Sequence, residues 1–489
     1  MNLTILSCEL TNLLRQRLLL LIVSISVIFS MLAIYNGQQL VAQQTAVVIE
    51  AQEEQQRAII TAKNGLAARE ALTQPVNWWD DHYDLRGQAF YLMLNYATKP
   101  PLDSAAIATG QSDVLPYFFK MLVTNKQDII NQYDAVHPLG LFVGKFDFAF
   151  FVIYILPLFI IGISFNALAQ ERQAGQLRLL MLQGLTPLRL LINQLILRCL
   201  LVVVPTLLVS CISLVYYQPQ INGEILLILC GLVIAYSMVW LSLTALVISF
   251  GKSPAYNASV LIISWLLFII VIPALINSVI VNFNPPPSRL QYIDDLRKHT
   301  DQLEKNSSQV LAKFFEDHPE LAGAETSTPV NSYSTTKIAK ITALEQAMAA
   351  SDLAFNFSIN QQQSWIEQLK FVSPATLLQS ALFQLSGNDL KRHQQFMLQV
   401  NRHHQQLRQF YQQRIVAAEQ LGLFTPCQGC NAKINLANLN DVPRFVYHEG
   451  PLAMPWSSLL SLLLLSIMLM LSAVKRLISL NNSQKIDDW

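Results

Sequence analysis

The chain has 489 residues, of which 52% are hydrophobic and only 13% are charged, and its mean hydropathy is +0.36. Soluble proteins carry about 25% charged residues, so this chain lacks the side chains to cover a soluble surface of its length. Its 33 Lys and Arg and 32 Asp and Glu give a net charge of +1, which excludes a broad basic surface for nucleic acid.

Apolar runs of roughly membrane-spanning length occur six times in the chain. A helix needs about 20 apolar residues to cross a hydrocarbon core about 30 Å thick. The runs are residues 18–35, 148–168, 195–215, 225–250, 258–281 and 456–474. The first exceeds the apolar part of a signal peptide, about 7–15 residues, and no small-residue cleavage pattern follows it, so we expect an uncleaved anchor. The predicted fold class is an all-α membrane protein with six transmembrane helices.

Basic residues in the short loops determine the predicted sidedness. They alternate consistently on one side of the spans, at Arg15, Arg17, Arg172, Arg178, Arg189, Lys252, Lys475, Arg476 and Lys485. The short opposite loop, residues 216–224, has none. Both termini are therefore predicted to be cytoplasmic, with an elbow helix over residues 1–17 and a tail over residues 475–489.

Two long segments, residues 36–147 and 282–454, then lie outside the membrane, before the spans at 148–281 and 455–474 respectively. We expect them to form two large, mainly α-helical extracytoplasmic insertions. Apolar residues at helical spacing indicate that 39–69 prolongs the first span outward. Further helices are predicted at residues 289–317, 338–369 and 374–421, the last interrupted near residues 386–388.

Several polar residues in these helices are predicted to face solvent or the membrane interface. His393 and His403 are ten residues apart and do not share a helix face, so they and His404 are predicted to lie on the surface. Arg198, at the start of the third predicted span, is expected to extend to the cytoplasmic interface.

The segment between the second and third spans, residues 169–184, has the sequence AQERQAGQLRLLMLQG. Its charges lie near the membrane and its leucines gather on one side. That pattern is typical of a helix that lies in the membrane interface or docks into a groove on a partner. The alternative is a solvated loop whose arginines only determine topology.

Four residues of this segment, Glu171, Arg172, Gly175 and Leu177, match the pattern E-(K/R)-x-x-G-T-L, with Gln176 in place of the usual Thr. That pattern and the leucine-rich turn after it are similar to the coupling loop of ABC type 2 permeases. The N-terminal ELTNLLRQR also resembles the elbow helix with which these permeases begin. The resemblance implies that the coupling loop 169–194, including Arg178, contacts a cytoplasmic ATPase subunit.

Two external stretches resemble signatures of a poorly characterised permease subfamily with two large external domains. The first is G-Q-S-D-x-x-P, formed by Gly110, Gln111, Ser112, Asp113 and Pro116. The second combines S-P-A at 373–375 with G-x-D-x-x-R at 387–392. From the residues alone, the first stretch is either a turn in which Ser112 or Asp113 caps a helix, or a contact with a substrate or partner.

Cys427 and Cys430 form the one local cysteine pattern, in a segment predicted to lie outside. We expect a structural disulfide that closes a tight loop. A redox site, half of a metal site and free thiols remain as alternatives, although no βαβ pattern or second ligand pair surrounds these cysteines. No metal site is predicted. The other cysteines, expected to act as small hydrophobic residues, are Cys8, Cys199, Cys211 and Cys230.

The resemblance implies a non-catalytic permease subunit of an exporter-class ABC transporter in the bacterial plasma (inner) membrane. The chain has no G-x-x-x-x-G-K-[ST] phosphate loop, so ATP and Mg are expected on the partner ATPase and no cofactor on this chain. Neither H-E-x-x-H nor G-x-S-x-G occurs. The expected partners are cytoplasmic ABC ATPase subunits, a second permease copy or a similar permease, an extracytoplasmic protein and membrane lipid, with no nucleic acid.

Three other functions remain open at this point. The first is mechanotransmission, in which ATPase strokes drive external partners and nothing crosses the bilayer. The second is a membrane-anchored thiol–disulfide catalyst that uses Cys427 and Cys430. The third is copper handling, suggested only because a permease for nitrous-oxide-reductase maturation is a relative.

Cysteine-accessibility labelling tests the predicted topology. On a background without native cysteines, single cysteines at Ser112 and Ser332 should react with a membrane-impermeant maleimide added from outside. Cysteines at Gln173 and Ser483 should react only after the membrane is opened. Labelling of Gln173 from outside would contradict the six-span arrangement.

Overall fold

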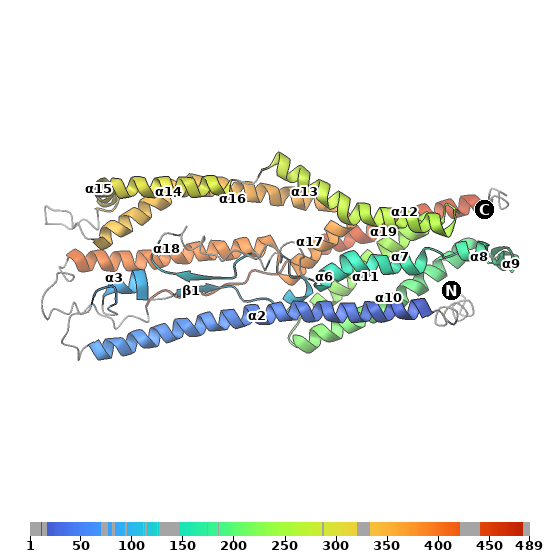
Figure 1. The fold of residues 1–489 in the computed structure, drawn as a ribbon, viewed down its shortest axis with the longest axis horizontal. Helices are drawn as coiled ribbons and strands as arrows, with labels where there is room; N and C mark the ends of the chain where they lie inside the picture. Colours follow the sequence, from blue (N-terminus) through green and yellow to red (C-terminus); the bar gives the residue numbers. More distant parts are fainter. Residues whose placement is uncertain are drawn as a thin grey trace.

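A computed structural model shows an elongated molecule whose helices run along one long axis (Figure 1). The structure describes residues 11, 17–69, 77–80, 84–92, 95–110, 112, 115–124, 126, 146–173, 175–183, 185–285, 288–319, 333–420 and 441–482. The predicted disulfide residues Cys427 and Cys430 lie outside these residues. Helices make up most of the described chain, which confirms the predicted α class.

The elements follow one another along the chain as helices and one pair of strands. They are α2 (Arg17–Arg69), α3 (Leu85–Gly87), η1 (Gln88–Leu92), β1 (Asn95–Thr98), η2 (Ala105–Ile107), β2 (Phe118–Met121), α6 (Phe148–Phe150), η3 (Phe151–Ile155), α7 (Leu156–Ser164), α8 (Ala169–Gln173), α9 (Gln176–Leu182), α10 (Pro187–Tyr217), α11 (Gly223–Ile248), α12 (Pro254–Leu266), η4 (Leu267–Val271), α13 (Ile272–Phe283), α14 (Arg289–Lys305), α15 (Ser307–Asp317), α16 (Tyr333–Leu369), η6 (Lys370–Val372), α17 (Pro374–Ser386), α18 (Leu390–Gln420) and α19 (Trp456–Asn482). The elements η1, η3 and η4 are π-helical turns, and η2 and η6 are 3₁₀ turns.

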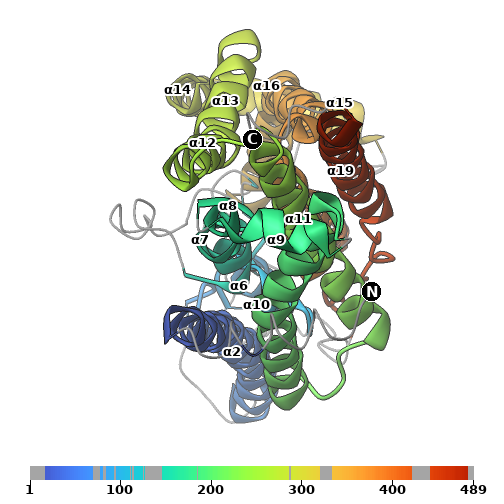
Figure 2. The same cartoon turned by 90° about the vertical axis from the view of Figure 1, so that its right-hand side faces the viewer.

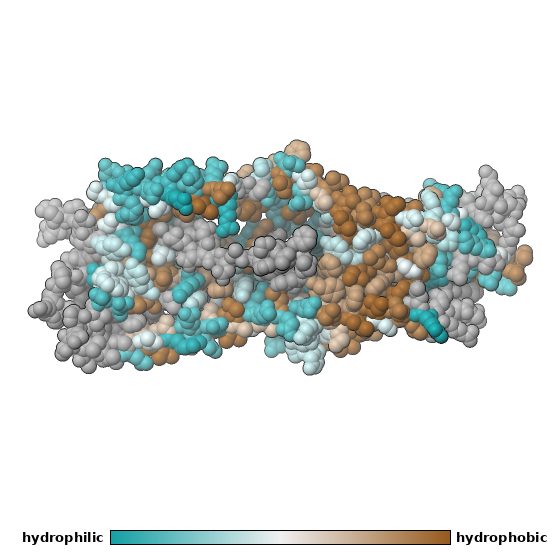
Figure 3. Space-filling view, viewed as in Figure 1, coloured by the Kyte–Doolittle hydropathy of each residue, from teal (hydrophilic) through white to brown (hydrophobic). Residues whose placement is uncertain are grey.

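Five of the described helices are long and apolar enough to cross a membrane. They are Leu19–Asn64, Pro187–Tyr217, Gly223–Ile248, Pro254–Phe283 and Trp456–Ser479. The remaining predicted span is a shorter apolar helix, Phe148–Ser164. Apolar side chains gather in one band across the molecule, with polar surface on both sides of it (Figure 3). The length and composition of these helices identify a multi-pass membrane protein.

Helix α2 confirms the predicted extension of the first span. It is a single helix of 53 residues, which corresponds to about 80 Å at 1.5 Å per residue. That length far exceeds a hydrocarbon core about 30 Å thick. Helix α2 therefore continues beyond the apolar band and joins it to the polar part of the molecule (Figures 1 and 3).

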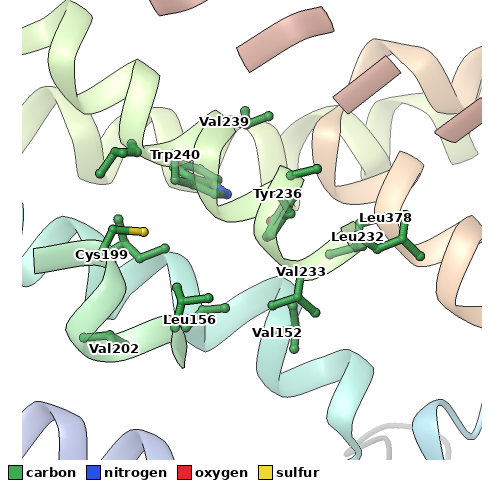
Figure 4. Close-up of a cluster of buried hydrophobic side chains, with 14 of the residues drawn as sticks. Val152, Leu156, Cys199, Val202, Leu232, Val233, Tyr236, Val239, Trp240 and Leu378 are labelled. Carbon is green, nitrogen blue, oxygen red and sulfur yellow. The ribbon is translucent and has the colours of Figure 1, made fainter. Parts of the chain in front are cut away.

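The core of the apolar band is built around α10 and α11, which pack against α2, α7 and α19. Figure 4 shows Leu156, Val202 and Trp240 among its buried side chains. Polar links supplement this packing, because Ser26 Oγ of α2 lies 2.8 Å from Thr206 Oγ1 of α10 in a buried hydrogen bond. The same core continues through Leu378 and Leu382 of α17, so the apolar band and the elements beyond it share one interior.

We call the part beyond the band the distal domain: the outer portion of α2, residues 84–126 where described, α14–α16, α18 and residues 441–450. It has its own hydrophobic cluster, which includes Phe119, Ile338 and Phe396. The strands β1 and β2 form a two-stranded antiparallel sheet that pairs Asn95 with Met121. The helix predicted at 289–317 is divided at Asn306, and the predicted interruption near 386–388 is confirmed between α17 and α18.

The prediction of surface histidines on α18 is wrong. His393, His403 and His404 are 8%, 5% and 2% exposed. His404 Nε2 lies 2.9 Å from the Thr124 carbonyl oxygen, and the rings of His403 and Phe445 are 5.5 Å apart. Helical periodicity separates positions around a helix but does not reveal how many sides neighbouring elements cover. Here α3, α16 and residues 441–450 cover several sides of α18.

Arg198 also differs from its prediction, because it is buried and only 7% exposed. Its Nη1 donates hydrogen bonds of 2.8 Å to the Ile163 carbonyl oxygen and to Asn166 Oδ1. Ile163 lies in the last turn of α7, where carbonyls have no partner within the helix. The guanidinium supplies a hydrogen-bond donor to one of these carbonyl oxygens. The helix ends at Ser164 instead of extending to residue 168.

Substitution of Gly37 tests the contact between α2 and the distal domain. A Cβ at Gly37 would lie 2.2 Å from the Ala106 carbonyl oxygen, so Gly37→Ala should force the backbones apart and cost about 1–3 kcal/mol. Gly162→Ala is the matched control in α7, since nothing lies within 4 Å of its added Cβ and alanine favours helix by about 1 kcal/mol. Thermal unfolding in detergent should show a lower midpoint for Gly37→Ala alone. Equal midpoints for the two variants would contradict this close approach.

Candidate functional site

The segment that connects the second and third apolar helices forms two short helices at one end of the molecule. Helix α8 ends at Gln173 and α9 begins at Gln176. Gly175 joins them with a φ of 71°, a left-handed conformation that glycine adopts without strain. Figure 2, which looks onto this end, shows α8 and α9 lying across the helical bundle.

Two residues of the predicted coupling pattern attach this segment to its own chain. Arg172 Nη2 donates to the Lys252 carbonyl oxygen at 2.8 Å, and its Nη1 donates to the Gly251 carbonyl oxygen. Gln194 Nε2 donates to Glu171 Oε1 at 2.5 Å. The pair therefore joins the segment to the α11–α12 turn and to α10.

The leucines of α9 are divided between the two sides of the helix. Leu177 is buried at 6% exposure and belongs to the main hydrophobic core. Leu179 and Leu182 are 63% and 87% exposed. Arg178 lies within α9, but its side chain is outside the described part. The segment thus has an anchored face and an exposed apolar face.

The second group of predicted residues lies in the part of the distal domain that is next to the apolar band. Gly110, Ser112 and Pro116 are described there, whereas Gln111 and Asp113 lie outside the described residues. Ser112 Oγ donates to the Thr109 carbonyl oxygen at 2.6 Å, which closes a turn. We call the region in which the two signature stretches meet the junction.

The two signature stretches meet at Asn388, which separates α17 from α18. Its Nδ2 donates to the carbonyl oxygens of Ala108, at 2.6 Å, and Ala105, at 3.3 Å. Gly110 has a φ of 54°, and a Cβ added there would lie 2.8 Å from the Asn388 carbonyl oxygen. Glycine is therefore required at position 110 by both backbone conformation and space. Residues nearly 280 positions apart thus form one contact.

Arg392, the last residue of the G-x-D-x-x-R pattern, holds three separate segments. It is 6% exposed, and its Nη2 donates to the Pro100 carbonyl oxygen at 2.8 Å. Its Nε and Nη2 donate to the two carboxylate oxygens of Glu449 at 2.8 and 2.6 Å. The Gly387 carbonyl oxygen accepts a further bond of 3.3 Å. The arginine is buried while Glu449 is 38% exposed, and the bidentate geometry of the pair makes the contact directional.

Two helix caps connect the junction to the apolar helices. Asp147 Oδ1 accepts from Phe150 N at 2.7 Å and so caps α6. Its Oδ2 accepts from both N and Oγ1 of Thr109, at 2.7 and 2.8 Å. Ser373, from the S-P-A pattern, caps α17 and donates at 2.5 Å to the carbonyl oxygen of Phe268 in the π-helical turn η4. Each capping side chain therefore bonds both to the helix that it caps and to a second segment distant in the sequence.

Burial changes the ionisation of two groups near Arg392. It lowers the pKa of Lys99 to about 8, with the Arg392 charge adding to the effect. Burial likewise lowers the pKa of His393 to about 4, and the Lys99 charge contributes. The histidine is therefore neutral at pH 7. Among the described residues, no group of three or more His, Cys, Asp or Glu could hold a metal ion.

Comparison with known proteins identifies one family match. A family described as Domain of unknown function (DUF3526) matches residues 289–425. This range includes the S-P-A and G-x-D-x-x-R patterns but not the segment 169–184. No curated protein matches the chain, and no solved structure matches it.

The sequence predicts several of these residues as functional but not the residues to which they bond. Asp147 and Gln194 are not among the predicted residues. Asp147 precedes an apolar run, and this position is a signal for a helix cap. Gln194 has no comparable signal, because its role depends on where α8 lies.

The buried His393 predicts a pH dependence for the distal domain. A folded pKa of about 4 lies below the unfolded value of about 6.5, so the unfolded chain binds more protons between these values. The contribution of His393 to stability should be fully present above pH 6.5 and fall by about 3 kcal/mol as the pH approaches 4. His393→Gln should reduce this fall in urea titrations at pH 7 and 4.5, whereas His448→Gln, at an exposed position, should not. An unchanged fall in His393→Gln would disprove the assignment.

Proposed function

We propose that this chain is the membrane subunit of an ATP-driven ABC transporter of the exporter class, in which a separate ATPase subunit binds and hydrolyses ATP. The observation that carries the proposal is the α8–α9 segment, which is fixed on one face and exposes apolar side chains on the other. It lies at the end of the molecule opposite the distal domain (Figure 1).

The exposed face of α9 has the features of a docking surface. Leu179 and Leu182 are too exposed to contribute much to the stability of this chain. Leucines on one face of a short helix fit an apolar groove on a partner. Partner binding would remove these side chains from water, at about 25 cal/mol for each Å² buried.

The anchored face supplies a route for force from such a partner. Glu171 and Arg172 bond to Gln194 and to the backbone of residues 251 and 252. A push on α9 would therefore reach α10 and the α11–α12 turn together. In this proposal Glu171 and Arg172 position the segment, while the leucines contact the ATPase.

Mechanotransmission is a second candidate, and the junction favours it. Helix α2 runs unbroken from the apolar band into the distal domain, and Ser373 bonds α17 to the π-helical turn η4. Movement of the membrane helices would then move the distal domain even if no substrate crosses. Both candidates use the same ATPase contact.

The test is co-expression of the chain with a candidate ABC ATPase subunit, followed by co-purification and ATPase assays. Leu179→Ser with Leu182→Ser should reduce recovery of the ATPase at least tenfold, because the apolar contact is lost. Glu171→Ala with Arg172→Ala should retain more ATPase but uncouple its activity. Leu290→Ser, at a position 81% exposed in α14, is the control and should behave as wild type. Undiminished recovery and activity in both double variants would refute the proposal.

A further inference from the structure

Two cysteines in the apolar band face each other across a helical hairpin. Cys211 lies in α10 and Cys230 in α11, and their Sγ atoms are 3.6 Å apart. Helix α10 ends at Tyr217 and α11 begins at Gly223. Each cysteine is thus six or seven residues from the hairpin turn, about 10 Å along its helix at 1.5 Å per residue. The equal depth explains why the side chains meet.

The contact between these sulfur atoms leaves little movement before a bond could form. A disulfide has an S–S length of about 2.05 Å, so the two atoms need to approach by roughly 1.5 Å. Neither side chain is fully buried, since both are at intermediate exposure in the chain. Because they lie in an apolar band, the molecules that can reach them there are lipid-soluble.

Cys199 provides a contrast within the same helix. It is 9% exposed and packs in the main hydrophobic core (Figure 4). It is a free cysteine with no thiol partner among the described residues. The chain therefore contains a paired and an unpaired thiol site in one membrane helix.

We propose that Cys211 and Cys230 form an oxidative modification site, which a lipid-soluble quinone converts to a disulfide. Each thiol loses its proton, one bond forms between the two sulfur atoms, and two electrons pass to the quinone. The two protons complete its reduction to the hydroquinone. The product covalently joins α10 to α11 on the side of the hairpin turn.

The test uses the full chain in membranes, with Cys8, Cys427 and Cys430 changed to Ser so that only the three described cysteines remain. Membranes are treated with decylubiquinone or, separately, with copper–phenanthroline. Free thiols are then trapped with N-ethylmaleimide after denaturation and located by peptide mass spectrometry. Both oxidants should produce a Cys211–Cys230 linked peptide, while Cys199 remains trapped as a free thiol. Cys211→Ser is the matched control and should leave Cys230 free, because serine preserves the size of the side chain but removes the partner.

Three outcomes would overturn the proposal. Full trapping of all three thiols after both treatments would show that the pair cannot be oxidised. Linkage of Cys199 to either cysteine as often as Cys211 to Cys230 would show that the facing geometry does not direct the reaction. A bond made only by copper–phenanthroline would overturn the quinone as the oxidant.

Discussion

Side-chain donors that bond to backbone carbonyl oxygens at breaks in helices hold the different parts of this protein together. A membrane protein must satisfy its backbone polar groups internally, so a helix end or π-helical turn at membrane depth needs a partner. In the apolar band, Tyr236 OH donates to the Ile153 carbonyl oxygen at 3.0 Å. Trp265 Nε1 donates to the Tyr154 carbonyl oxygen at the same distance. Both acceptors belong to the π-helical turn η3.

The same interaction recurs at several other breaks between elements. Arg172 bonds the carbonyls of the α11–α12 turn, and Asn388 bonds the loop around η2. Arg392 bonds Pro100, while Ser373 bonds η4. These donors connect the α8–α9 segment to the apolar helices, and the apolar helices to the distal domain. Each of these contacts joins segments that are at least 80 residues apart in the sequence.

The sequence was informative where a signal is local. Apolar length located five helices long enough to cross a membrane, helical spacing placed the extension of α2, and Gly387 marked the end of α17. The junction could not be predicted, because Asn388 bonds to backbone atoms about 280 residues away and a carbonyl carries no residue identity. The prediction that His393 lies on the surface failed for a related reason. Spacing along α18 gives its faces, but only the path of residues 441–450 and the placement of α3 and α16 reveal which faces are covered.

Bonds from side-chain donors to backbone oxygens place different demands on the donor residue and on the acceptor residue. An acceptor such as Pro100 or Lys252 contributes only its backbone oxygen, so its side chain can change without loss of the bond. The donor cannot change in this way, since Arg392 also satisfies both oxygens of Glu449 and its removal would leave that carboxylate without its bidentate partner. In the second signature stretch, Ser373 and Arg392 donate bonds to other segments, and Gly387 allows a close approach of Leu102. Recognition of such a junction in another chain would depend on its donors and glycines, while the residues that they hold could vary.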